Sequence, residues 1–183
     1  MPSSRPARGA ADGVPGLHVV RLTPEDWRRY AELRIAMLTD APDAFWTTLE
    51  EVRARTEEQW RRASNANTLQ ARDGNSTPLG TVTVLTEETV PDKGMRPAPG
   101  DALVLAVYVV PAARGRGVID ALLDAALTLA RDELGSQRMV LQVNERNEAA
   151  IRVYERHGYR LTGGFLQHPD RPGVRDVEMA RPV

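Results

Sequence analysis

Cysteine is absent from the 183 residues of this chain, and its absence removes several kinds of chemistry at once. Disulfide bonds, thiolate metal sites and a cysteine nucleophile are all excluded, and a reducing compartment is permitted without being proved. Long apolar runs are absent too. The longest, Ala102 to Ala113, is interrupted by Pro111 and falls short of the roughly 20 residues that cross a bilayer. The sequence therefore predicts no membrane span.

The chain also lacks an excess of charge of either sign. It has 24 Lys and Arg against 25 Asp and Glu, for a formal charge of -1. No overall field therefore draws it to nucleic acid or to an anionic membrane. Apolar residues make up 42% and charged residues 27%, which is ordinary for a soluble protein of one domain.

The first 16 residues differ in composition from the rest. They are rich in Pro, Gly and Ala, and although Arg5 and Arg8 are basic, no apolar segment of a secretory signal follows them. We expect residues 1–16 to form a flexible leader in a cytoplasmic protein, and residues 17–183 to form a single domain.

Helix and strand signals follow one another along that domain. Thr23 before Pro24 and two acids is a helix start. Short β-prone runs separated by turn residues indicate strands, and the first two after residue 67 form a hairpin. The expected strands are 17–22, 68–72, 79–85, 102–110, 139–144, 161–168 and 174–180, the expected helices are 24–38, 49–63, 118–134 and 147–157, and 87–101 is an irregular loop.

The centre of the predicted sheet is a β-α-β unit. Residues 102–110 are almost continuously apolar, which is typical of a strand buried on both faces. An amphipathic helix follows and ends near Gly135, where a left-handed cap belongs. The next strand, residues 139–144, should lie parallel to the first with a right-handed crossover. The last two strands should close the chain as an antiparallel pair.

The segment Arg114-Gly115-Arg116-Gly117-Val118 lies between the central strand and the helix. Glycines allow a ligand to approach the backbone closely, and the N–H groups of the first helical turn have no partner within the helix. Together with the positive end of the helix dipole, these donors suit a pyrophosphate. The arrangement predicts an anion site.

Two common phosphate-binding motifs fit this segment poorly. A Walker A loop needs Lys followed by Ser or Thr after the second glycine, where Val118 and Ile119 stand. A dinucleotide-binding fingerprint needs a third glycine where Asp120 stands, and a first strand near the start of a domain.

The segment resembles instead the GNAT superfamily of acyl-coenzyme A-dependent N-acyltransferases. Val107 to Pro111 followed by Arg114 to Val118 is similar to that family's central strand and its Arg/Gln-x-x-Gly-x-Gly/Ala loop. A second block resembles the family's next strand, Asn-capped helix, tyrosine and Gly-aromatic ending; it comprises Leu141 to Val143, Asn147 to Ala150 and Tyr154 to Tyr159. Two blocks in the right order are much more specific than either alone.

The resemblance implies an α/β fold of the GNAT type. It has six or seven mostly antiparallel strands, a parallel central pair that splays after a bulge, and helices on both faces of the sheet. It also implies an acetyltransferase that uses acetyl-CoA as cosubstrate on an amine acceptor, with a homodimer as an option. Metal is not expected, because the histidines lack ligand spacing.

Residue roles carry over with the resemblance. Pantetheine would bond to the backbone of the central strand, and pyrophosphate to the N–H groups of the glycine loop, flanked by two arginines. One asparagine would touch the middle of the cofactor, and Tyr154 would lie near its sulfur as general acid or hydrogen-bond donor. The cofactor-binding set is Val107, Tyr108, Val109, Arg114, Gly115, Arg116, Gly117, Val118, Ile119, Asp120 and Asn147.

Three positions depart from the family pattern. Ile119 replaces Gly or Ala and could crowd the phosphates or point into the core. Leu103 is on the first central strand, where many members carry an acid, and Gln142 is on the second, where some members do. The open candidates for a base are Asp101, Glu87, Glu88, His168 and a chain of waters.

Plainer roles also exist for the same residues. Asn147 is a good helix cap whatever the function, Tyr154 could be a core residue, and Arg114 and Arg116 could be surface charges. Phe45 and Trp46 could line an acceptor site or simply pack. The missing acids favour a second hypothesis, a GNAT-like sensor or interaction module that holds acyl-CoA without turnover.

Overall fold

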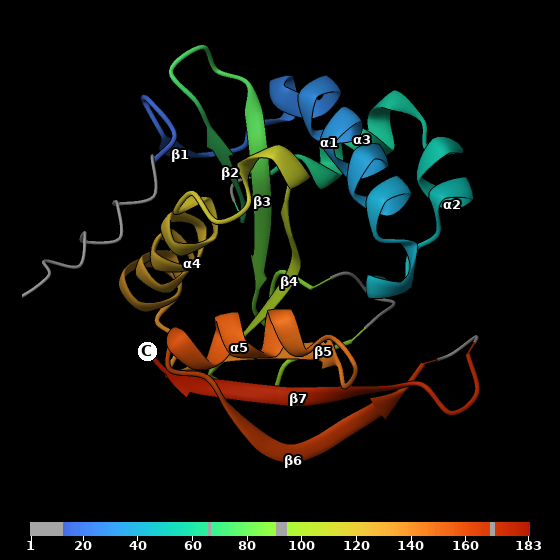
Figure 1. Ribbon diagram of the computed structural model, residues 1–183, viewed down its shortest axis with the longest axis vertical. Coiled ribbons are helices and arrows are strands. Elements are labelled where there is room, and N and C mark those ends of the chain that lie inside the picture. Colours follow the sequence, from blue (N-terminus) through green and yellow to red (C-terminus); the bar gives the residue numbers. More distant parts are fainter. Residues whose placement is uncertain (1–12, 66, 91–94, 169–170) are drawn as a thin grey trace, which may run out of the picture.

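The computed structural model describes residues 13–65, 67–90, 95–168 and 171–183. Within them, one seven-stranded sheet runs through the molecule in the order β1-β2-β3-β4-β5-β7-β6 (Figure 1). Neighbouring strands are antiparallel except β4 and β5, which are parallel. The strands are β1 (His18–Arg21), β2 (Thr68–Arg72), β3 (Pro78–Leu85), β4 (Asp101–Val109), β5 (Arg138–Asn144), β6 (Arg160–Gln167) and β7 (Arg175–Pro182).

Helices cover both faces of the sheet, so the predicted fold class is confirmed. On one face α1, α2 and α3 pack around Met37, Trp60 and Tyr108. On the other face α4 and α5 pack around Leu122, Tyr154 and the apolar side of the central strands. The helices are α1 (Trp27–Asp40), α2 (Leu49–Arg53), α3 (Glu57–Ala63), α4 (Val118–Thr128) and α5 (Glu148–Arg156), with a π-helical turn at Leu129–Glu133 after α4.

The prediction of a single helix over 49–63 is wrong in one respect, because this segment forms two helices, α2 and α3. Thr48 caps α2 and Thr56 caps α3, each in a reciprocal pair of bonds with the residue three positions on. The backbone of Thr56 is extended, with φ -73° and ψ 162°. A second capping box therefore ends the first helix, since a cap residue cannot itself be helical.

Part of the expected leader lies outside the described residues. Residues 13–16 lie against the turn between β2 and β3, where the Gly74 N–H donates to the Pro15 carbonyl at 3.1 Å and Val14 packs on the core. Residues 91–94 of the expected loop and residues 169–170 of the last turn also fall outside. No helix among the described residues combines the length and apolar character needed to span a membrane.

The two central strands separate part-way along their length. β4 and β5 pair from Asp101↔Arg138 to Val104↔Leu141, after which the two strands continue without pairing with each other. At the same level the register between β4 and β3 shifts, and Ala106 has a φ of 54°. A left-handed conformation costs a residue with a Cβ about 1–2 kcal/mol, so a bulge is built in here at some expense. The β5-facing edge of β4 is left without a strand partner.

Candidate active site

The glycine loop turns left-handed twice before α4 begins. Gly115 has a φ of 72° and Gly117, the N-cap of α4, a φ of 81°, and a Cβ added at either would meet nothing within 4 Å. Backbone conformation rather than crowding therefore calls for glycine at both positions. The two left-handed residues turn the backbone into the start of the helix.

The N–H groups at this turn form a cradle of open donors. Among the described residues, the first N–H of α4 with a backbone acceptor is that of Ala121, bonded to the Gly117 carbonyl at 3.1 Å. Those of Val118, Ile119 and Asp120 have no backbone acceptor in this part of the chain. Donors directed outward at a helix start, beside left-handed glycines, fit a phosphate group.

The Ile119 side chain is partly buried and packs against the core beneath α4. This departure from the family pattern is thus accommodated by the hydrophobic core. In the cradle itself the backbone, not a side chain, supplies the donors.

The two loop arginines bind protein groups in this structure. Arg114 donates to the Val109 carbonyl at 3.0 Å and to the Asp40 carboxylate, which joins the end of β4 to the end of α1. Arg116 donates to the Gly13 carbonyl at 3.2 Å. Arg114 therefore braces the loop rather than presenting a free charge to it.

A side-chain bond fixes the spacing of α4 and α5 beside the cradle. His157 Nε2 lies 2.8 Å from the Asp120 carboxylate, so the end of α5 is tied to the first turn of α4. Asn147 starts α5, where its side-chain oxygen accepts from the Ala150 N–H at 3.1 Å. Its capping role is confirmed, and its amide NH₂ makes no bond to a described residue.

Tyr154 of α5 is only 8% exposed and packs edge-on against Tyr159, with ring centroids 5.8 Å apart. Burial raises the pKa of Tyr154, so its hydroxyl stays protonated at neutral pH. That hydroxyl has no hydrogen-bond partner among the described residues. Tyr154 therefore keeps a proton that it could donate as a hydrogen bond.

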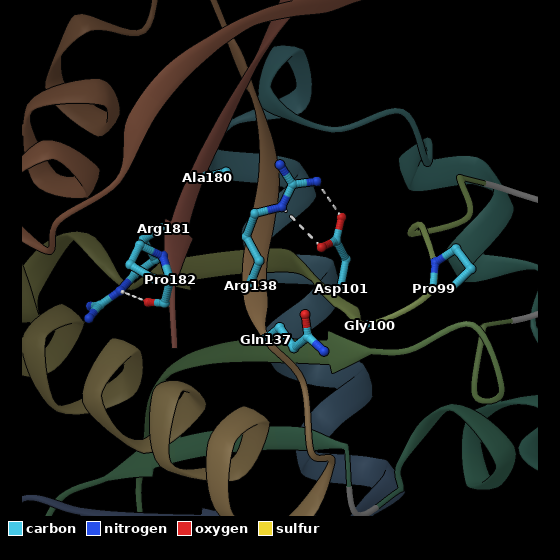
Figure 2. Close-up of a pocket in the computed structure, with 8 residues that line it drawn as sticks. All are labelled: Pro99, Gly100, Asp101, Gln137, Arg138, Ala180, Arg181 and Pro182. Carbon is cyan, nitrogen blue, oxygen red and sulfur yellow. Dashed lines mark hydrogen bonds and ion pairs between the residues drawn. The ribbon is translucent and has the colours of Figure 1, made fainter.

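Of the candidate bases, Asp101 is held elsewhere. Arg138 binds both of its carboxylate oxygens, at 3.0 and 2.6 Å (Figure 2). The pair lines an open cavity of about 400 Å³ where β4 begins. Asp101 is thus held in an ion pair at the start of β4, before the last β4–β5 pair at Val104↔Leu141.

His168 and Trp46 lie together on the face of the sheet that carries α1. Their rings meet edge to face with centroids 6.1 Å apart, and Trp46 Nε1 donates to the Asp176 carboxylate at 2.6 Å. With Leu38, Phe45 and Leu49 they line a cavity of about 240 Å³. Phe45 and Trp46, the two aromatic residues predicted as candidates for an acceptor site, both line this cavity. Glu87 and Glu88 are exposed in the turn after β3.

Sequence reasoning did not single out two carboxylates of β7. Asp176 receives the Trp46 bond, and Glu178 accepts from Gln142 Nε2 at 3.2 Å. The alternation of polar and apolar residues in this strand puts the two acids on one face. Which strand lies next to them depends on the order β5-β7-β6, in which the last two strands reverse their sequence order. Among the described residues no group of His, Asp and Glu could hold a metal ion.

A family model described as "Acetyltransferase (GNAT) family" matches residues 27–159, which include both sequence blocks, the cradle and Tyr154. The chain belongs to the GNAT family. The family assignment made from the two blocks is thereby confirmed, as is the expected class of this domain, an acyltransferase that uses acetyl-CoA.

Curated relatives point to the same class. Mycothiol acetyltransferase of Salinispora tropica is 34% identical over 130 residues, covering 69% of this chain and 39% of the relative. The Propionibacterium freudenreichii protein of the same name is 32% identical over 166 residues, covering 91% and 50%. The chain thus spans half or less of the length of these relatives.

Solved structures share the GNAT fold. A GCN5-related N-acetyltransferase from Kribbella flavida has a TM-score of 0.68 at 24% identity, covering 92% of this chain and 98% of that one. The yncA protein of Salmonella typhimurium, solved with acetyl-CoA, has a TM-score of 0.67 at 18% identity, covering 91% and 94%.

Proposed function

We propose that this GNAT protein transfers the acetyl group of acetyl-CoA to a primary amine of a small molecule, peptide or protein by direct attack. The observation that supports it best is the combination of open N–H donors at the start of α4 with an unpaired edge of β4 beyond the Ala106 bulge. The backbone of Val107 to Val109 offers hydrogen bonds to pantetheine, and Gly115 to Asp120 offer donors to the pyrophosphate. Asn147 offers its amide to the middle of the cofactor.

The amine must lose a proton before it can attack. A lysine-like amine has a pKa near 10.4, about 3.4 units above neutral pH, which corresponds to roughly 4.6 kcal/mol. The departing thiolate needs, in contrast, a donor that stabilises its negative charge. A thiol with a pKa near 8.5 is a stronger acid than a buried tyrosine, so Tyr154 stabilises the thiolate by donating a hydrogen bond.

The acceptor is proposed to enter through the cavity beside Trp46. Its walls include Leu38, Phe45 and Trp46, which suit an apolar body next to the amine. The bond from Trp46 to Asp176 holds the indole ring at the edge of this cavity. The relatives' name makes the acceptor of mycothiol acetyltransferases one compound to test, although this chain spans only part of those proteins.

The proposal is tested by following release of the CoA thiol with a panel of primary amines that includes that acceptor. We expect turnover that depends on both the amine and acetyl-CoA. Tight binding of acetyl-CoA without turnover on any amine would instead favour the sensor hypothesis. The cytoplasmic location and the homodimer stay predictions.

A further inference from the structure

Glu178 of β7 stands beside the point at which β4 and β5 separate. Pairing between those strands ends at Val104↔Leu141, so Gln142 is the first residue of β5 beyond the last pair. In the ladder between β5 and β7, the residue opposite Gln142 is Glu178. Neighbouring strands are about 4.8 Å apart, so the carboxylate is one strand away from the opening.

The side chain of Glu178 is on the face of the sheet that carries α1 and the Trp46 cavity, where the acceptor is proposed to enter. Val177 and Met179, its neighbours in β7, pack into the core that contains Tyr154. Side chains alternate along a strand, so Glu178 points to the opposite face, together with Asp176 and the Trp46 cavity. Tyr154 and Glu178 thus approach the separated strands from opposite faces.

Neutral donors orient the Glu178 carboxylate. Gln142 Nε2 donates to one oxygen at 3.2 Å, and the Thr162 hydroxyl donates to the other at 2.8 Å. Gly164 makes room beside it, because a Cβ at that position would be 3.4 Å from the Glu178 Cβ. Each oxygen retains a lone pair for a further donor.

No ion pair among the described residues occupies this carboxylate. On the same face of the adjoining strands, Arg138 pairs with Asp101 and Asp176 accepts from Trp46. Arg160, opposite Ala180 in the ladder, donates to the Glu155 and Tyr159 carbonyls. The pKa of Arg138 is raised first by its hydrogen bonds to Asp101 and also by the charge of Glu178, while its hydrogen bonds to described residues go to Asp101. A partly buried carboxylate with neutral partners is suited to attract an ammonium group and accept its proton.

We propose that Glu178 is the proton acceptor for the amine, directly or through one water, an inference that rests on the proposed acetyl transfer. Glu178 takes one proton from the ammonium group, and the nitrogen lone pair then forms the C–N bond to the thioester carbonyl carbon. The C–S bond breaks and its electron pair leaves with the CoA sulfur. The second proton of the nitrogen ends on that sulfur, and the proton on Glu178 passes to solvent.

The arrangement accounts for the two missing acids. Leu103 and Gln142 leave the central strands without a carboxylate, and the cross-strand neighbour of Gln142 supplies one. Gln142 then acts as a positioning residue, because its amide holds Glu178 toward the opening.

The test is Glu178→Gln, which preserves side-chain shape but cannot accept a proton. We expect kcat/KM for a strongly basic amine to fall about 100-fold or more at pH 7, with the Kd for acetyl-CoA unchanged. The loss should shrink as pH rises toward the pKa of the amine, because the acceptor then deprotonates itself. A weakly basic amine, already neutral at pH 7, should lose much less.

Glu57→Gln is the matched control, since Glu57 lies on α3 and, within the described part of the chain, pairs with Arg61 alone. It should leave both pH profiles as they are. If the wild type turns over but Glu178→Gln loses less than threefold, or loses equally with strong and weak bases at every pH, the role of Glu178 is contradicted. If the wild type itself does not turn over, it is the proposed function that fails. Should Glu178→Gln fail to fold, Thr162→Val tests the same carboxylate, and an unchanged pH profile there contradicts the proposal.

Discussion

Tyr154 is the residue that we propose assists the leaving thiolate. It comes from α5, packs against Tyr159 and keeps its proton because burial raises its pKa. Tyr154→Phe removes only the hydroxyl, so we expect kcat to fall about 100-fold while the Kd for acetyl-CoA stays within twofold. Steady-state rates and equilibrium binding provide the two values. A change in kcat below tenfold would remove Tyr154 from the mechanism.

The same burial gives the fold a dependence on alkaline pH. Burial raises the pKa of both Tyr154 and Tyr159 above that of tyrosine in the unfolded chain, near 10. Their stabilising contribution is therefore complete below about pH 10 and is lost as pH rises further, because the unfolded state releases the protons first. The urea midpoint should fall between pH 8 and pH 11, and by less in Tyr154→Phe. Equal falls would contradict this assignment.

The bulge in β4 is the element that opens the sheet. Ala106 adopts a φ of 54°, which glycine adopts freely and β-branched residues resist most strongly. We expect Ala106→Val to lower the melting temperature by several degrees and to weaken acetyl-CoA binding, whereas Ala106→Gly changes the melting temperature little. Calorimetric melting and titration of the two variants test this. Equal effects of valine and glycine would show that the bulge conformation is not strained.

The elements themselves could largely be predicted from local sequence. The apolar run of β4, the Asn147 cap and the glycines before α4 each depend on neighbouring residues, so the local sequence pattern is sufficient to predict these elements. The break between α2 and α3 was missed because Thr56 also fits within an exposed helix. The Ala106 conformation could not be predicted from sequence periodicity, since alanine gives no signal of a positive φ.

Across the whole molecule, the parts of the site come from distant segments. Both sequence blocks predicted the cofactor side, because the loop and α5 follow directly after β4 and β5. The proposed acceptor side joins Trp46 to Asp176 and Gln142 to Glu178, contacts that depend on strand order. No local pattern reveals that β7 inserts between β5 and β6. The carboxylates of β7 were therefore visible only in the folded chain.

The account rests on acetyl-CoA binding through the backbone of the glycine loop and the separated strands. Calorimetric titration of acetyl-CoA into the protein tests it most directly, with Gly117→Val as the comparison, because valine opposes the φ of 81° that aims the donors. We predict one site per chain with a micromolar Kd, and binding at least tenfold weaker in a variant that is folded by circular dichroism. Absence of binding heat in the wild type at several temperatures, or equal affinity in Gly117→Val, would contradict it.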